Sequence, residues 1–210
     1  MRRLWVPFAM AVLLVAVLAA TGCSASVSTG SSSPTPASSS GSTAATKTYS
    51  NTQYSFRITY PASFKQGNPS GASSAGSSAA FEVIFADPKG AQVNNLYVDT
   101  VGVSVYQLKR SVSAAEVPKL KQQFDQLVSQ LMSGFPGAKI TQPLGPTVIN
   151  GVPGFKFGYS YAKGSTQIQA VTYFLLKRSY EYELTEQASQ QNWATVSPQL
   201  DAAVKSFTVL

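Results

Sequence analysis

The feature that most constrains this chain is its only cysteine, Cys23, because a lone cysteine rules out a disulfide framework within the chain. Cys23 ends an apolar N-terminal run that follows Arg2 and Arg3. A positive start, an apolar stretch and small residues at its end are typical of a secretory signal peptide. We therefore predict a signal peptide over residues 1–22, and any domain beyond it must be stabilised by its hydrophobic core alone.

The residues around the expected processing site, Ala20-Thr21-Gly22-Cys23, resemble the lipobox of bacterial lipoproteins. The resemblance implies that Cys23 becomes the first residue of the mature chain and carries acyl chains such as palmitate. Several acyl chains give stable membrane anchoring. Two alternatives stay open: an uncleaved transmembrane helix, because the apolar run is near the lower length limit for one, and a cleaved chain without lipid.

The segment after the cysteine changes composition sharply. Residues 24–48 are almost entirely Ser, Thr, Gly, Ala and Pro. Such a stretch has no apolar face to bury, so we predict that residues 23–48 form the lipidated cysteine and a disordered tether. A coil of this length reaches about 25–30 Å on average. The tether would hold a folded domain at the extracytoplasmic face of the cell membrane.

The remainder, residues 49–210, has the length of one domain. Removing the signal peptide lowers the formal net charge from +7 by two, to +5. The basic residues are scattered along the sequence without a dense block, and the export signal takes the chain away from nucleic acid. We therefore expect no nucleic-acid partner and only modest attraction to anionic polymers or lipids of the envelope.

Alternating apolar residues predict strands in two parts of this domain. The period of two appears in Tyr54–Tyr60, and strands are also predicted at 81–86, 96–106, 139–144, 155–161, 166–176 and 180–184. Asn150-Gly151 and Lys177-Arg178-Ser179 are predicted turns.

Two stretches show helical spacing instead. A capping box, Ser113-Ala114-Ala115-Glu116, precedes a predicted helix from Leu120 to Leu131. A final helix places Trp193, Leu200 and Phe207 on one stripe. The order of elements predicts an α+β domain, with an antiparallel sheet flanked by helices.

Three short motifs carry a family resemblance. Residues 54–61 (YSFRITYP) are similar to the opening strand of PsbP/Mog1-like domains, Asn150–Gly154 to their central turn, and Leu200–Phe207 to their closing helix. Together with the lipobox and the tether, the chain resembles LpqN/LpqT-type lipoproteins of actinobacteria. The resemblance implies an α/β/α sandwich and partner-binding roles, without catalytic residues that match positions of this sequence.

The composition excludes several kinds of catalytic site. The chain has no histidine, so Ser-His and Cys-His catalysis and imidazole metal sites are excluded, and we predict no metal or other cofactor. Glu181 and Glu183 share one face of a predicted strand, and such a pair suits acid–base work on a sugar. We interpret them instead as a solvated strand face, paired across the sheet with Lys156 or Arg57.

The aromatic side chains are the main candidates for a binding site. We expect them to crowd one sheet face beside the final helix, as core packing or as a groove for a lipid, glycan or peptide. The candidate ligand-binding residues are Tyr159, Tyr161, Tyr173, Tyr180, Tyr182 and Trp193.

The sequence therefore predicts a non-enzymatic, lipid-anchored envelope protein that binds a protein, glycan or lipid partner. The alternative is a carrier of an apolar ligand such as a cell-wall lipid, which would need a cavity of several hundred cubic ångströms. A carboxylate-dependent enzyme acting on an envelope glycan is the third hypothesis.

Overall fold

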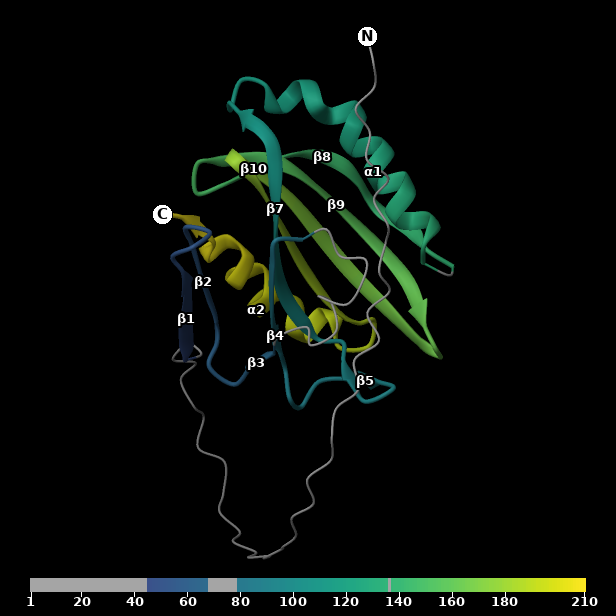
Figure 1. Cartoon of the computed structure of the whole chain (residues 1–210). Helices are drawn as coiled ribbons and strands as arrows, with labels where there is room; N and C mark the ends of the chain where they lie inside the picture. Colours follow the sequence, from purple (N-terminus) through teal and green to yellow (C-terminus); the bar gives the residue numbers. More distant parts are fainter. Residues whose placement is uncertain (1–44, 68–78, 136) are drawn as a thin grey trace, which may run out of the picture.

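The computed structural model describes residues 45–67, 79–135 and 137–210 (Figure 1). The predicted signal peptide, Cys23 and residues 24–44 of the predicted tether lie outside the described residues. None of the described helices is both long enough and apolar enough to cross a membrane.

The centre of the domain is one antiparallel sheet. In spatial order its strands are β3 (Lys65–Gly67), β4 (Phe81–Ala86), β7 (Thr100–Val112), β10 (Thr166–Ser189), β9 (Val152–Lys163) and β8 (Lys139–Ile149).

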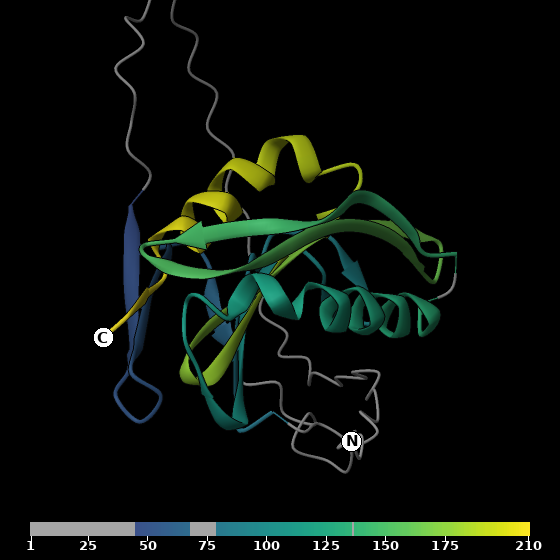
Figure 2. The same cartoon turned by 90° about the horizontal axis from the view of Figure 1, so that it is seen from above.

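Smaller elements surround this sheet. They are a second sheet of β1 (Thr46–Asn51), β2 (Phe56–Pro61) and β11 (Thr208–Val209), a short pair β5 (Gln92–Val93) and β6 (Leu96–Tyr97), a 3₁₀ turn η1 (Val117–Leu120), and the helices α1 (Lys121–Ser133) and α2 (Trp193–Ser206). Seen along its edge, the main sheet lies between α2 on one side and α1 on the other (Figure 2). The predicted α+β sandwich is confirmed.

Strand β10 is one run of extended residues that folds back on itself. Thr172 Oγ1 lies 2.9 Å from Thr185 Oγ1, although in a straight strand these residues would be about 40 Å apart. The chain reverses at Arg178, whose φ of 57° is the left-handed conformation typical of tight hairpin turns. One arm then pairs with β9 and the other with β7. The predicted turn at 177–179 is confirmed.

Each face of the main sheet has its own hydrophobic core. The first face packs against α2 and the β1–β2–β11 sheet, and its largest fully buried side chains include Phe56, Phe85, Tyr182, Leu184 and Phe207. The second face packs against α1 through Phe124, Val128, Phe155, Phe157 and Phe174.

The start of the domain differs from the predicted boundary. Strand β1 begins at Thr46, inside the segment predicted as tether, and pairs in antiparallel register with β2 from Thr46–Pro61 to Asn51–Phe56. A polar sequence forms a strand here because β2 supplies its hydrogen-bond partners, a long-range effect that composition does not encode. The predicted Asn150-Gly151 turn is confirmed, with φ values of 47° and 78°.

Candidate functional site

The six predicted aromatic site residues do not share one sheet face. Tyr173, Tyr180, Tyr182 and Trp193 belong to the first core, and Tyr159 and Tyr161 belong to the second. The prediction of a single aromatic cluster is therefore wrong.

The register of β9 with β10 explains the split. Tyr159 lies opposite Ala170, and Tyr173 lies opposite Lys156. Partners directly across a sheet point to the same face, and neighbours along a strand alternate. Because 170 and 173 differ by an odd number, Tyr159 and Tyr173 point in opposite directions.

The tyrosines are part of the core packing. The Tyr182 hydroxyl donates to Tyr54 O at 2.9 Å, and the Tyr161 hydroxyl donates to Gln187 Oε1 at 3.0 Å. Burial raises the pKa of both Tyr161 and Tyr182 to about 12. Buried phenols that satisfy their hydroxyl groups inside the protein are typical of structural residues, so the interpretation as packing fits better than an open aromatic groove.

The two predicted glutamates lie on the second face, as expected from their alternation with Tyr182 and Leu184. Glu183 lies opposite Ser104 of β7, and Ser104 lies opposite Glu82 of β4. Two residues along, on the same face, Glu181 lies opposite Tyr106. We call this group the carboxylate face; it consists of Glu82, Ser104, Tyr106, Glu181 and Glu183.

Burial dominates the electrostatics of the carboxylate face. The pKa of Glu181 is raised to about 8 by burial and by the neighbouring Glu183, and the pKa of Glu183 is raised to about 7 by burial and by Glu82. Burial and the three carboxylates also move the pKa of Tyr106 above its usual range. Ser104 Oγ donates to Glu82 Oε1 at 3.3 Å.

The expectation that these glutamates form a solvated face paired with Lys156 or Arg57 is wrong. Both glutamates are only partly exposed, and neither belongs to an ion pair among the described residues. Lys156 lies on the first face, where its Nζ is 6.0 Å from the ring centre of Tyr173. A basic residue on the opposite side of a sheet cannot neutralise the carboxylates.

The carboxylate face combines chemical groups that suit a polar partner. Carboxyl groups with pKa values near 7 are partly neutral at physiological pH, so they both donate and accept hydrogen bonds. Ionised, the same groups attract cationic side chains. Among the described residues, no group of three or more Asp, Glu, Cys or His side chains is arranged to hold a metal ion.

Two buried carboxylates were missed by the sequence reasoning. Asp99 is fully buried; its Oδ1 accepts from Ser189 N at 2.9 Å, and its Oδ2 accepts from Asn192 Nδ2 at 2.7 Å and from Ala91 N at 3.1 Å. It therefore ties the end of β10 and the start of α2 to the β5 loop. The signal that could have identified Asp99 is its position as a lone acid within an apolar strand sequence.

Glu186 is the second missed carboxylate. It is 3% exposed on the first face, where the Tyr173 hydroxyl donates to its Oε1 at 3.4 Å, and its Oε2 has no hydrogen-bond partner among the described residues. Burial and the nearby Asp201 raise the pKa of Glu186 to about 7. The signal that could have placed Glu186 on the first face is its alternation in register with Tyr182 and Leu184.

Comparison with solved structures shows what the fold is similar to. A cyanobacterial PsbP from Synechocystis matches with a TM-score of 0.55 and 15% identity over 83% of this chain and 98% of that chain. A protein from Bacteroides thetaiotaomicron matches with a TM-score of 0.51 and 8% identity over 78% of this chain and 48% of its own. At these identities the matches show a shared fold alone.

The mycobacterial protein LpqN, whose structure is described as involved in cell envelope biogenesis of Mycobacterium tuberculosis, matches more distantly. Its TM-score is 0.44 and its identity 12%, over 80% of this chain and 86% of that chain. This similarity carries no argument about function, and the LpqN/LpqT-type assignment stays a prediction. Comparison with curated protein sequences gives no significant match.

The sequence profile of the PsbP family matches residues 44–209, which include every described strand and helix. The profile match and the sandwich fold agree with the predicted PsbP-like domain. The chain belongs to the PsbP family.

Proposed function

We propose that this protein is a lipid-anchored protein of the bacterial cell envelope, and that its PsbP domain is a non-enzymatic module that binds a partner. The lipobox at Cys23 supports anchoring at the extracytoplasmic face of the membrane. The family membership supports a single folded domain at the end of the tether.

One observation carries the partner-binding role. Helix α1 packs over the β8–β9 side of the second face (Figure 1). The residues of the carboxylate face come from β4, β7 and the second arm of β10. Glu181 and Glu183, whose pKa values burial raises, are costly for a sheet that needs only to fold. A partner that supplies cationic or hydrogen-bonding groups would compensate for this cost.

A site-specific photocrosslinker tests this role. The full chain is expressed in its host with the crosslinking residue at Ser104, inside the carboxylate face, or at Thr141, on the edge strand β8. We expect a discrete crosslinked species from position 104 that disappears in the Glu181→Gln/Glu183→Gln variant. Equal crosslinking from both positions, or crosslinking that survives the double substitution, would argue against the carboxylate face as the binding surface.

The carrier hypothesis is less well supported, because aromatic rings pack closely on both faces. Tyr60 and Phe85 stack with ring centres 4.0 Å apart on the first face, and Phe124 lies 5.1 Å from Phe174 on the second. A carrier needs an apolar cavity in place of such contacts. Native mass spectrometry of the purified chain separates the two hypotheses: a co-purifying lipid would favour the carrier.

An enzymatic role stays the third hypothesis. Glu181 and Glu183 are two residues apart on one strand face, which places their backbones about 6.6 Å apart. A glycosidase would lose activity on an envelope glycan in the Glu183→Gln variant, whereas a binding module would lose crosslinking without any glycan cleavage in the parent protein.

The anchor has its own test. No other residue of the chain can accept a thioether-linked lipid, so Cys23→Ala should abolish partitioning of the protein into the detergent phase. If the variant still enters the detergent phase, cleaved and at full yield, lipidation is not the anchor.

A further inference from the structure

The fold gathers four basic residues that are far apart in the sequence. Lys177 and Arg178 lie at the β10 reversal, and Lys109 and Arg110 lie near the end of β7. We call these four residues the basic tip.

The register explains how the two basic pairs meet. Arg178 lies opposite Val112, and Tyr180 lies opposite Gln107. The pairing therefore advances by two residues along β10 and by five residues along β7. The extra β7 residues therefore form a bulge beside the turn. Gln107 Nε2 donates to Ser179 O at 3.3 Å, which holds the bulge and the turn together.

The charges of the basic tip are directed to solvent. Lys109, Arg110 and Arg178 are exposed, and Lys177 is half-buried. Arg110 Nη1 forms an ion pair with Glu116 at 2.8 Å, yet its side chain remains 62% exposed. The basic residues are scattered along the sequence, but the hairpin and the register shift bring two of their pairs to the same end of the main sheet.

The conformation of Arg178 is an independent observation. Its φ of 57° lies in the left-handed region, where three of the other four non-glycine residues with positive φ are asparagines. Asparagine and glycine adopt this conformation with less strain than arginine. An arginine at the strained position of the turn is therefore better explained by what its guanidinium binds than by the needs of the fold.

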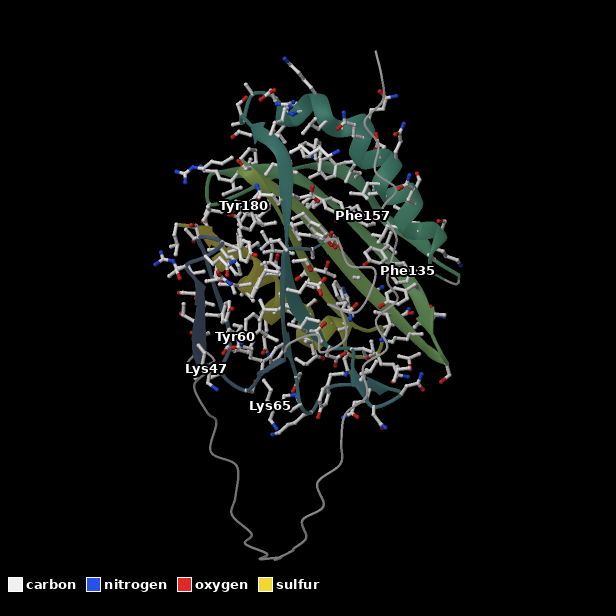
Figure 3. The ribbon with its side chains drawn as sticks, viewed as in Figure 1. Lys47, Tyr60, Lys65, Phe135, Phe157 and Tyr180 are labelled. Atoms are coloured by element: carbon white, nitrogen blue, oxygen red, sulfur yellow. The ribbon has the colours of Figure 1, made fainter. Side chains whose placement is uncertain are left out.

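The basic tip also lies at a defined end of the domain. The Tyr180 ring beside it is 5.8 Å from the ring of Tyr54 in the β1–β2 turn, whereas the chain enters β1 at Thr46, the other end of that strand. Figure 3 shows Tyr180 in the upper part of the domain and Lys47 and Lys65 near the lower end. The basic tip therefore lies at the end of the domain opposite the point where the tether enters.

We propose that the basic tip binds a linear polyanion of the envelope, a polymer with phosphate or carboxylate groups repeated along its chain. The orientation of the tip rests on the anchoring in the proposed function. Arginine binds phosphate and carboxylate oxygens in a bidentate manner, and flanking lysines add attraction without demanding one geometry. Two neighbouring basic pairs can therefore contact successive anionic groups of one polymer.

The test uses the full chain incorporated into neutral phosphatidylcholine vesicles and long-chain polyphosphate as the probe. We expect the vesicles to capture labelled polyphosphate, less so as the salt concentration rises. Lys109→Gln/Arg178→Asn should weaken capture at least tenfold, since each basic side chain near an anionic surface contributes about fivefold. The control Lys47→Gln/Lys65→Gln removes the same charge at the other end and should change capture by less than about twofold.

Two outcomes would overturn the proposal: equal weakening in both double variants, or no capture above protein-free vesicles. Arg178→Asn should leave the thermal midpoint unchanged or raised, so lost capture cannot be ascribed to unfolding. If the protein does not associate with vesicles, the anchoring proposal fails, and polyphosphate binding is then measured with the chain in neutral detergent.

Discussion

The two faces of the main sheet meet in the second arm of β10, where consecutive side chains serve opposite purposes. Tyr182 and Leu184 point to the first face and are buried under β2 and α2. Glu181 and Glu183 point to the second face and join the carboxylate face. The same strand therefore supplies buried apolar side chains to the first core and, on its other side, carboxyl groups whose pKa values are raised.

The comparison shows that the elements packed over a sheet face determine the role of the side chains on that face. On the first face, the helix, the small sheet and the aromatic rings interlock; Phe56 stacks on Phe207 at 5.7 Å. On the second face, α1 reaches the β8–β9 side, and the acids lie beside it. Burial and the neighbouring carboxylates raise the pKa values of Glu181 and Glu183 there.

The largest effect should come from breaking the first face. Phe207 is fully buried at the end of α2, so Phe207→Ala should lower the free energy of unfolding by about 3–5 kcal/mol. Denaturant unfolding followed by tryptophan fluorescence measures the loss. Val148→Ala, at a side chain 66% exposed on β8, is the matched control and should change stability by less than about 0.5 kcal/mol.

The second prediction concerns the pH dependence of the carboxylate face. Because the folded pKa values of Glu181 and Glu183 lie above the ordinary value of 4.5, their contribution to stability is fully present below pH 4.5 and is lost as the pH rises through 7 and 8. We expect a loss of at least about 2 kcal/mol over this window, measured as the free energy of unfolding against pH.

The Glu181→Gln/Glu183→Gln variant should remove most of that slope. Glu116 gives the opposite sign, since hydrogen bonds from Ser113 and Arg110 lower its pKa to about 2, so its contribution disappears only as the pH falls below 4.5. A double variant with the same slope as the parent would show that the carboxylate face is more solvated than its burial indicates.

A smaller effect should come from Trp193. It is half-buried at the start of α2 and packs at the margin of the first core. Trp193→Ala should therefore lower stability by about 1–2 kcal/mol, less than Phe207→Ala. Acrylamide quenching of its fluorescence provides a second measurement: free quenching together with unchanged stability would identify Trp193 as an exposed binding platform.

The smallest effect should come from Glu186, the buried carboxylate on the first face. Glu186 faces Tyr173, Asp201, Lys156 and Lys205, and its Oε2 has no hydrogen-bond partner among the described residues. Glu186→Gln should raise stability by about 1 kcal/mol at pH 8, where the parent carboxylate is ionised, and change it little at pH 5. Destabilisation at pH 8 would show that the charge is compensated after all.

The local pattern of the sequence determined much of this protein. Period-two alternation predicted strands β2, β4 and β9, the Asn150-Gly151 and Arg178 turns followed from short-range turn chemistry, and helical spacing predicted α1 and α2. Alternation also placed Glu181 and Glu183 opposite Tyr182 and Leu184. Each of these properties depends on neighbours within a few residues.

Only the tertiary structure decided which residues meet and what covers them. The register of β9 with β10 separated Tyr159 from Tyr173, and the pairing with β2 turned Thr46–Thr48 into a strand. The pairing of β7 with β10 placed two basic pairs at the same end of the sheet. Whether Glu183 faces water or a half-buried surface depends on side chains from β4 and β7, about 80–100 positions away in sequence. These properties were not predictable from the sequence. Alternation shows only that a strand has two faces, whereas contacts between distant segments determine the strand register, the elements packed over each face and the electrostatic environment of a side chain.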